Sequence, residues 1–199
     1  EETDRIVWAA KYPLHIERID DGYPVYEKME PVPFTDTECE CDLNEREVFY
    51  VFCVKPAYEG SHCTHNVCSF SRYINVMEPA AVKRFIDLCF EPIASALPDA
   101  YAGAAAVFTD EPSLQVGYVR SYECWPYALA PWKEGLFDNF MGEYGFDLRP
   151  YLPLLFEGGR EAWPIRVLFY ELVGKLIARA YSGQLQDWPD GTPLTIATL

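Results

Sequence analysis

The chain has 199 residues, half of them hydrophobic and 16% aromatic, which is ample for a packed core and argues against disorder. Its 31 acidic and 16 basic residues give a formal charge of −15, which would repel a phosphate backbone or an anionic lipid surface, and no apolar run approaches the roughly 20 residues that span a bilayer. Nucleic acid and membrane are therefore not expected as partners.

The first 72 residues are predicted to form a β-rich insertion or small subdomain. Residues 5–10 and 47–54 are short alternating or aromatic runs that are typical of strands, and acidic and proline-containing segments separate them. Residues 58–72 are polar and weakly patterned, so they are expected to form a connection.

The seven cysteines are odd in number and lack the spacing of a disulfide framework. This favours free thiols and a cytoplasmic over a secreted location, although the compartment stays open. Cys53 in a strand-like run and Cys89 on an apolar helical stripe are expected to be small buried hydrophobes. Residues 62–68 carry two histidines and two cysteines, which are zinc ligands, but no second pair of cysteines follows. A loop with free thiols or a Cys63–Cys68 bridge is therefore expected there, and zinc is the alternative.

An amphipathic helix is predicted from about residue 78. Pro79 suits its first turn, and Pro92 is expected to end or kink it. Five apolar residues recur at helical spacing: Val82, Phe85, Ile86, Cys89 and Phe90.

A short apolar run over residues 105–109 predicts a buried strand that stops at Asp110, Glu111 and Pro112. Because Pro112 cannot continue a ladder, the two acids are expected at the carboxyl end of the strand, the edge that holds the chemistry in α/β barrels. Successive strand side chains point to opposite faces, so at most one acid would face a ligand, and Glu111 is preferred. The alternative is that both acids only cap the following loop.

The loop after this strand, residues 113–135, is long and aromatic, and such loops often carry binding. Trp125 and Trp132 present flat apolar surfaces that could stack on sugar rings, or else they anchor the loop. Arg120 could contact substrate hydroxyls, whereas Arg166, on a later helix, is expected to pair with an acid in a structural role.

Further helices are predicted over residues 136–144, 148–156 and about 161–186, with Gly145 stopping the first and Asp147 capping the second. Trp163 and Trp188 flank the last helix and are expected to pack. Residues 194–199 then begin a strand. The order helix, strand, helices, strand predicts an α/β fold with a parallel sheet covered by helices, but periodicity does not separate an open sheet from a barrel.

Several short motifs follow one another in order between residues 73 and 185. They are YINVMEPAAV at 73–82, FTDEP at 108–112, PW at 131–132, YGFDL at 144–148, LPLLF at 152–156, and Arg166 with Phe169-Tyr170. In this order they resemble landmarks of the α-L-rhamnosidase-like glycoside hydrolases of family 106, large multidomain enzymes with a catalytic (β/α)8 barrel. Asn75 stands where the family pattern has an acid, and Glu78 stands where it has Asn.

The resemblance implies that residues 73–199 form part of a TIM-barrel catalytic domain, preceded by the β-rich insertion of residues 1–72. It also implies barrel strands before residue 1 and after residue 199, with a further acid and a histidine there, so the chain is expected to be a fragment that needs the missing parts of its own full-length chain. The implied activity is hydrolysis of a glycosidic bond in a plant or microbial polysaccharide, with an oligosaccharide or glycoside as substrate. Calcium is the one cofactor that the resemblance permits.

The sequence therefore predicts a glycoside hydrolase, and the alternatives are a non-catalytic carbohydrate-binding module or a zinc-stabilised interaction domain. The candidate catalytic residues are Glu111 and Asp110, and the candidate substrate-binding residues are Trp132, Trp125, Arg120 and Asn75. None of them is assigned as a metal ligand.

Overall fold

The computed structural model describes residues 4–16, 22–55, 74–109, 112, 114, 128–188 and 195–198. These residues mix helices and strands, which fits the predicted α/β class. The chain divides into two compact units, Glu1–Ala57 with Gly135–Val167, and Tyr58–Glu134 with Leu168–Leu199. This division follows compactness, so the predicted domain boundary at residue 72 stays a prediction. None of the helices in the described part of the chain is long and apolar enough to span a bilayer.

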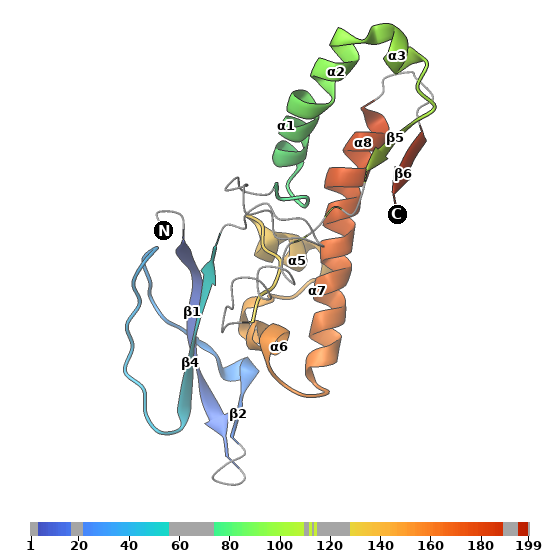
Figure 1. The fold of residues 1–199 in the computed structure, drawn as a ribbon. Coiled ribbons are helices and arrows are strands. Elements are labelled where there is room, and N and C mark those ends of the chain that lie inside the picture. Colours follow the sequence, from blue (N-terminus) through green and yellow to red (C-terminus); the bar gives the residue numbers. More distant parts are fainter. Residues whose placement is uncertain are drawn as a thin grey trace. The chain divides into compact units, whose positions relative to one another are not determined.

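The first unit contains an antiparallel sheet built on one long strand. Its strands are β1 (Arg5–His15), β2 (Tyr23–Pro24), β3 (Glu30–Pro31) and β4 (Glu47–Val54). β1 pairs antiparallel with each of the other three, and β1 and β4 run side by side in Figure 1. The strands predicted over residues 5–10 and 47–54 are thus confirmed.

A register shift between Ile6 and Trp8 changes which β1 residues lie on each face of the β1–β4 ladder. Because the bulge shifts the alternation by one residue, Ile6 and Ala9 lie on the same face, where they pack with Val32. The opposite face carries Tyr12, which is fully buried. Its ring lies edge-on to Tyr50, with 5.5 Å between the centroids, and to Tyr26 of the short 3-10 helix η1 (Tyr26–Lys28), at 6.2 Å.

The expectation that Cys53 and Cys89 are buried is wrong, because both side chains are exposed. Cys53 lies one residue from the end of β4, which pairs only with β1 among the described strands. Cys89 is the last residue of its helix, where the buried face has already ended at Ile86. Apolar spacing alone does not bury a side chain at the end of an element.

Glu47 begins β4 and forms a polar contact with β1. Its carboxylate accepts hydrogen bonds from the Asn44 backbone N–H and from Lys11 Nζ, both at 3.1 Å. The hydrogen bond from Asn44 and then that from Lys11 hold the pKa of Glu47 below its ordinary value. The ionised form of Glu47 is therefore favoured in the folded chain.

We expect this contact to weaken in acid. Because the folded pKa lies below the unfolded value, its stabilisation is fully present above the unfolded pKa and is lost as pH falls through the folded pKa. Urea unfolding midpoints of the wild type and Glu47→Gln, measured from neutral to acidic pH, should therefore converge as pH falls, with exposed Glu45→Gln as the control. Midpoints that differ by a constant amount across this range would contradict the prediction.

The remaining helices of the first unit follow the predicted order. They are α5 (Leu136–Tyr144), the 3-10 helix η2 (Arg149–Tyr151) and α6 (Pro153–Phe156). Gly145 has φ of 77° and its N–H donates to the Met141 carbonyl at 2.8 Å, so the predicted left-handed cap is confirmed. Asp147 Oδ1 accepts the Arg149 N–H at 3.0 Å, at the start of the short helical segment that it was predicted to cap.

The long helical segment predicted near residues 161–186 is confirmed, although it changes helix type near its end. It consists of α7 (Ala162–Ile177), the π-helical segment η3 (Ala178–Gly183) and α8 (Gln184–Asp187). The prediction that Trp163 packs is wrong, since 67% of its surface is exposed. It precedes buried Leu172 by nine residues, which places it on roughly the opposite side of the helix. Trp188 does pack, with ring centroids 5.2 Å from Phe90 and 5.4 Å from Tyr101.

Arg166 of α7 has the predicted structural role but with different partners. Its Nε donates to the Leu154 carbonyl at 2.8 Å, and its Nη2 donates to the Glu157 carbonyl at 3.0 Å. Carbonyls at a helix C-terminus lack partners within the helix, so an arginine satisfies them as well as it would pair with an acid.

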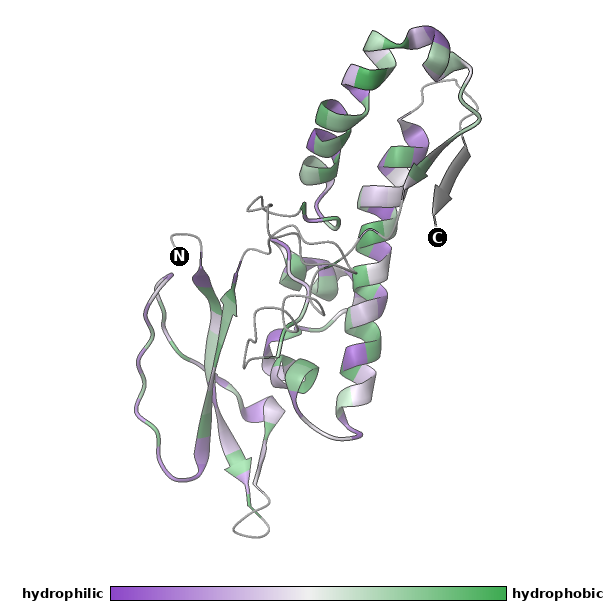
Figure 2. Cartoon of the chain, viewed as in Figure 1, coloured by the Kyte–Doolittle hydropathy of each residue, from purple (hydrophilic) through white to green (hydrophobic). Residues whose placement is uncertain are grey.

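The second unit begins with three consecutive helices, α1 (Pro79–Cys89), α2 (Glu91–Ala96) and α3 (Pro98–Ala102). α1 begins with Pro79 as predicted, and the chain continues as a helix after Phe90, so Pro92 marks a kink in place of an end. Hydrophobic residues recur among hydrophilic ones along α1, as the sequence pattern predicts (Figure 2).

A strand pair follows the helices in the second unit. β5 (Ala106–Thr109) and β6 (Thr195–Thr198) pair in parallel and lie side by side (Figure 1). Ala106 lies opposite Thr195, and Thr109 lies opposite Thr198. The predicted parallel pairing is thus confirmed for these two strands. Because parallel strands end at the same edge of a sheet, Thr109 and Thr198 mark a common carboxyl edge.

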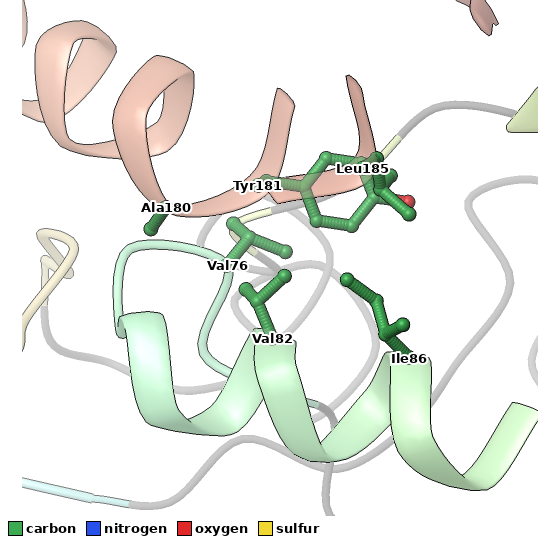
Figure 3. Packing of buried hydrophobic residues seen from close by; sticks show 6 residues of the cluster. All are labelled: Val76, Val82, Ile86, Ala180, Tyr181 and Leu185. Atoms are coloured by element: carbon green, nitrogen blue, oxygen red, sulfur yellow. The ribbon is translucent and has the colours of Figure 1, made fainter. Parts of the chain in front are cut away.

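One hydrophobic cluster forms the core of this unit. Val82 and Ile86 of α1 point toward Tyr181 of η3 (Figure 3). The buried members of the cluster are Val76, Val82, Ile86, Ala180, Tyr181 and Leu185, and partly buried side chains including Leu114 and Trp188 pack against them. Residues from before α1, from the segment after β5 and from η3 thus meet in one core.

Candidate active site at the carboxyl end of β5

β5 ends at Thr109, immediately before the two acids in the chain. Thr109 is 7% exposed, and its Oγ1 lies 2.7 Å from the Tyr181 hydroxyl, so that either group could donate. Asp110, Glu111, Arg120 and Trp125 lie outside the described residues. The structure therefore describes the strand that precedes the acids in the chain, and the catalytic role of the acids stays a prediction.

The prediction that β5 is buried is only half right. Thr109 is buried against Tyr181, but 59% of the surface of Phe108 is exposed. Successive strand side chains point to opposite faces, and among the described residues only the face that carries Thr109 is covered. An apolar run of this length therefore does not require cover on both faces.

The structure brings together two of the predicted substrate-binding residues. Asn75 Nδ2 donates to the Trp132 carbonyl at 2.8 Å, although the two residues are 57 positions apart. Asn75 Oδ1 accepts the Met77 N–H at 3.1 Å. The amide of Asn75 thus joins the turn before α1 to the loop before α5, and Trp132 is half-buried beside it.

An ion pair that sequence reasoning missed lies between the same two segments. Lys133 Nζ lies 3.3 Å from Glu78 Oε2, and it donates to the Glu134 carbonyl at 2.8 Å. The Lys133 side chain is only 12% exposed. Glu78, which departs from the family pattern, is therefore the partner of a lysine next to Trp132. The only signal in the sequence was the position of Lys133 directly after the Pro-Trp motif.

One buried cluster links these contacts to the end of β5, through Val76 and Tyr181. Val76, which follows Asn75, belongs to the same buried cluster as Tyr181 (Figure 3). The Tyr181 hydroxyl in turn contacts Thr109. Leu114, three residues after Glu111, packs against that cluster as well. We call the five residues Asn75, Glu78, Thr109, Trp132 and Lys133 the strand-end site. An amide, an ion pair and an indole ring are groups that recognise sugar hydroxyls and sugar faces.

The metal predictions remain untested. Among the residues that the structure describes, no three His, Cys, Asp or Glu side chains form a group that could hold a metal ion. The candidate zinc segment at residues 62–68 lies outside these residues, as do the two acids after β5, whose oxygens would suit calcium. Zinc and calcium therefore both stay predictions.

We expect Asn75→Asp to destabilise the chain, because a carboxylate cannot donate to the Trp132 carbonyl. Loss of this hydrogen bond should lower the free energy of unfolding by about 1–3 kcal/mol in urea denaturation near neutral pH. Asn139→Asp, at an exposed position of α5, is the matched control. Equal losses in the two variants would show that the hydrogen bond contributes nothing.

Comparison with known proteins gives a similarity in fold. No protein-family model matches the chain, and no curated protein matches it. In fold it is similar to a rhamnosidase from Novosphingobium sp. PP1Y, with a TM-score of 0.54 and 14% sequence identity. The match covers 87% of this chain and 16% of that chain, so this chain spans a small part of that protein's length. The chain therefore has a rhamnosidase-like fold.

Proposed function

We propose that the chain is part of an α-L-rhamnosidase-like glycoside hydrolase of the family-106 type, which cleaves a glycosidic bond in a plant or microbial polysaccharide. The observation that carries the proposal is the likeness of 87% of the chain to a rhamnosidase structure. The order of motifs from YINVMEPAAV to Phe169-Tyr170 supports it independently. The match covers only 16% of that structure, so in this proposal the remaining catalytic parts would belong to the rest of a longer protein.

Within this proposal β5 and β6 are neighbouring strands of a (β/α)8 barrel. Their parallel pairing supports this arrangement, and so do the helices that lie between them in the chain. Active sites of such barrels lie at the carboxyl ends of the strands. Thr109 marks that end, so the following acids would stand at the barrel mouth.

Glu111 is the proposed catalytic or substrate-orienting carboxylate, and the neighbouring Asp110 is proposed to support Glu111. Glycosidic cleavage generally uses two carboxyl groups, about 5–5.5 Å apart for retention and about 6.5–9.5 Å apart for inversion. Adjacent residues on one strand end cannot easily flank a bond in this way, so the second acid would come from the rest of the protein.

The substrate-binding roles follow from the chemistry of the strand-end site. The half-buried indole of Trp132 would stack on a sugar face, and Asn75 and Lys133 would orient hydroxyls beside it. Arg120 and Trp125 are proposed to contact the substrate from the intervening loop.

Hydrolysis of aryl glycosides by the complete protein tests the proposed function. We expect an aryl α-L-rhamnoside to be cleaved in preference to the corresponding glucoside, galactoside and xyloside. Tight binding of an oligosaccharide in calorimetric titration, without turnover of any glycoside, would instead identify a carbohydrate-binding module. Absence of both turnover and binding in a folded sample would reject both functions.

A further inference from the structure

We infer that Tyr181 is a positioning residue, whose hydroxyl holds the end of β5 and thereby sets the place of the acids that follow it. This inference rests on the proposed function, in which those acids act on the substrate. It assigns a role to a residue that the sequence motifs did not single out.

The contact between Tyr181 and Thr109 joins two buried hydroxyl groups from distant parts of the chain. Their oxygens are 2.7 Å apart and the residues are 72 positions apart. Both residues are buried, so neither hydroxyl is freely exchanged for water. Removing one partner alone would leave the other as a buried polar group without this hydrogen bond.

Tyr181 is held firmly enough to act as a fixed point. Its ring packs in the cluster with Val82 and Ile86 of α1 (Figure 3). Gln184, three residues later, donates from Nε2 to the carbonyls of Ala180 at 2.7 Å and Pro79 at 2.9 Å. The helix backbone around Tyr181 is therefore tied to the start of α1.

The helix that contains Tyr181 also changes type around this residue. It lies in the π-helical segment η3, between α7 and α8. Wider turns of this kind are rare inside helices, and they frequently occur at functional sites. The wider turn of η3 includes Tyr181, whose hydroxyl contacts Thr109, the last residue of β5.

Asp110 and Glu111 follow Thr109 directly in the chain, so a displacement of Thr109 would also displace the two acids. Glu111 follows Thr109 by two residues, which corresponds to at most about 7 Å of backbone. A displacement of about 1 Å at a reacting group is enough to reduce a rate about a hundredfold. Loss of the hydroxyl contact should therefore lower kcat without removing any group that touches the substrate.

The test uses the complete protein with Tyr181→Phe, Thr109→Val, Thr109→Ser and the double variant T109V/Y181F. We expect Tyr181→Phe and Thr109→Val to lower kcat by about 10- to 100-fold with little change in KM. Thr109→Ser keeps the hydroxyl, so its kcat should stay close to that of the wild type. The double variant removes both hydroxyls of the pair, so its thermal midpoint should lie closer to wild type than two independent losses would place it, while its kcat stays low.

The outcomes separate this inference from the proposed function. If the wild-type protein hydrolyses no glycoside, the proposed function is rejected, and the inference about Tyr181 is rejected with it. If the wild-type protein is active and Tyr181→Phe has the same kcat, the positioning role of Tyr181 is rejected and the proposed function is not. Recovery of kcat together with the thermal midpoint in the double variant would also overturn it, because the contact would then serve stability only.

Discussion

Glu111→Gln in the complete protein is expected to lower kcat for a rhamnose-containing disaccharide by about 10²- to 10⁴-fold, the usual contribution of a positioned acid or base. The amide has nearly the shape of the carboxyl group but can neither give up nor accept the proton. If Glu111 protonates the leaving oxygen, a nitrophenyl rhamnoside should be far less affected, since its leaving group needs little protonation. Comparing kcat for the two substrates therefore tests the role as well as the residue.

Asp110→Asn is the matched control, because it makes the same chemical change one residue earlier in the chain. If Asp110 only supports its neighbour, this variant should lose less activity than Glu111→Gln on both substrates. A larger loss in Asp110→Asn would reverse the assignment of the two acids. Undiminished turnover of both substrates by Glu111→Gln would reject a catalytic role for that carboxylate.

Phe140→Ala should cause the largest loss of stability that the described core predicts, about 3–5 kcal/mol in the free energy of unfolding. Phe140 is fully buried in α5, and its ring centroid lies 4.8 Å from that of Tyr144 and 5.2 Å from that of Phe146. The substitution removes the ring and leaves a cavity between these two aromatic side chains. Urea denaturation followed by tryptophan fluorescence measures the loss.

The neighbouring position on the same helix provides the control for Phe140. Met141 is exposed, so Met141→Ala should change the free energy of unfolding by about 0.5 kcal/mol or less. Similar losses in the two variants would contradict the described orientation of α5.

The helices and strands could be predicted largely because their signals are local. Val82 and Ile86 recur at helical spacing and are both buried, and Gly145 stands where the left-handed cap of α5 is found. Exposure was predicted less well, since it depends on what covers a face. Phe108 and Trp163 are apolar, but no described residue covers them sufficiently to bury them.

The site could be predicted only in part, for a related physical reason. The sequence indicated Asn75 and Trp132 separately, but the hydrogen bond between them depends on a fold that brings residues 57 positions apart together. The same holds for Thr109 and Tyr181, because a tyrosine in an apolar helix pattern reads as a core residue. Lys133 had no signal beyond its position directly after the Pro-Trp motif, and a lysine in a loop is usually solvated.

Asn75 and Glu78, the two departures from the pattern of the family that the sequence resembles, have defined contacts in the structure. Asn75 and Glu78 both bind the loop around Trp132, the first through its amide and the second through Lys133. An acid at position 75 would lack the donor that reaches the Trp132 carbonyl. In this chain the two residues therefore act together to hold the loop that carries the proposed stacking tryptophan.

A crystal structure of the complete Glu111→Gln variant with an α-L-rhamnoside bound would test the central claim most directly. We expect the glycosidic oxygen to lie within hydrogen-bond reach, about 3 Å, of the side chain at position 111 or 110, with the sugar against Trp132. A rhamnoside bound away from the carboxyl end of β5, with both acids remote from the glycosidic bond, would contradict it.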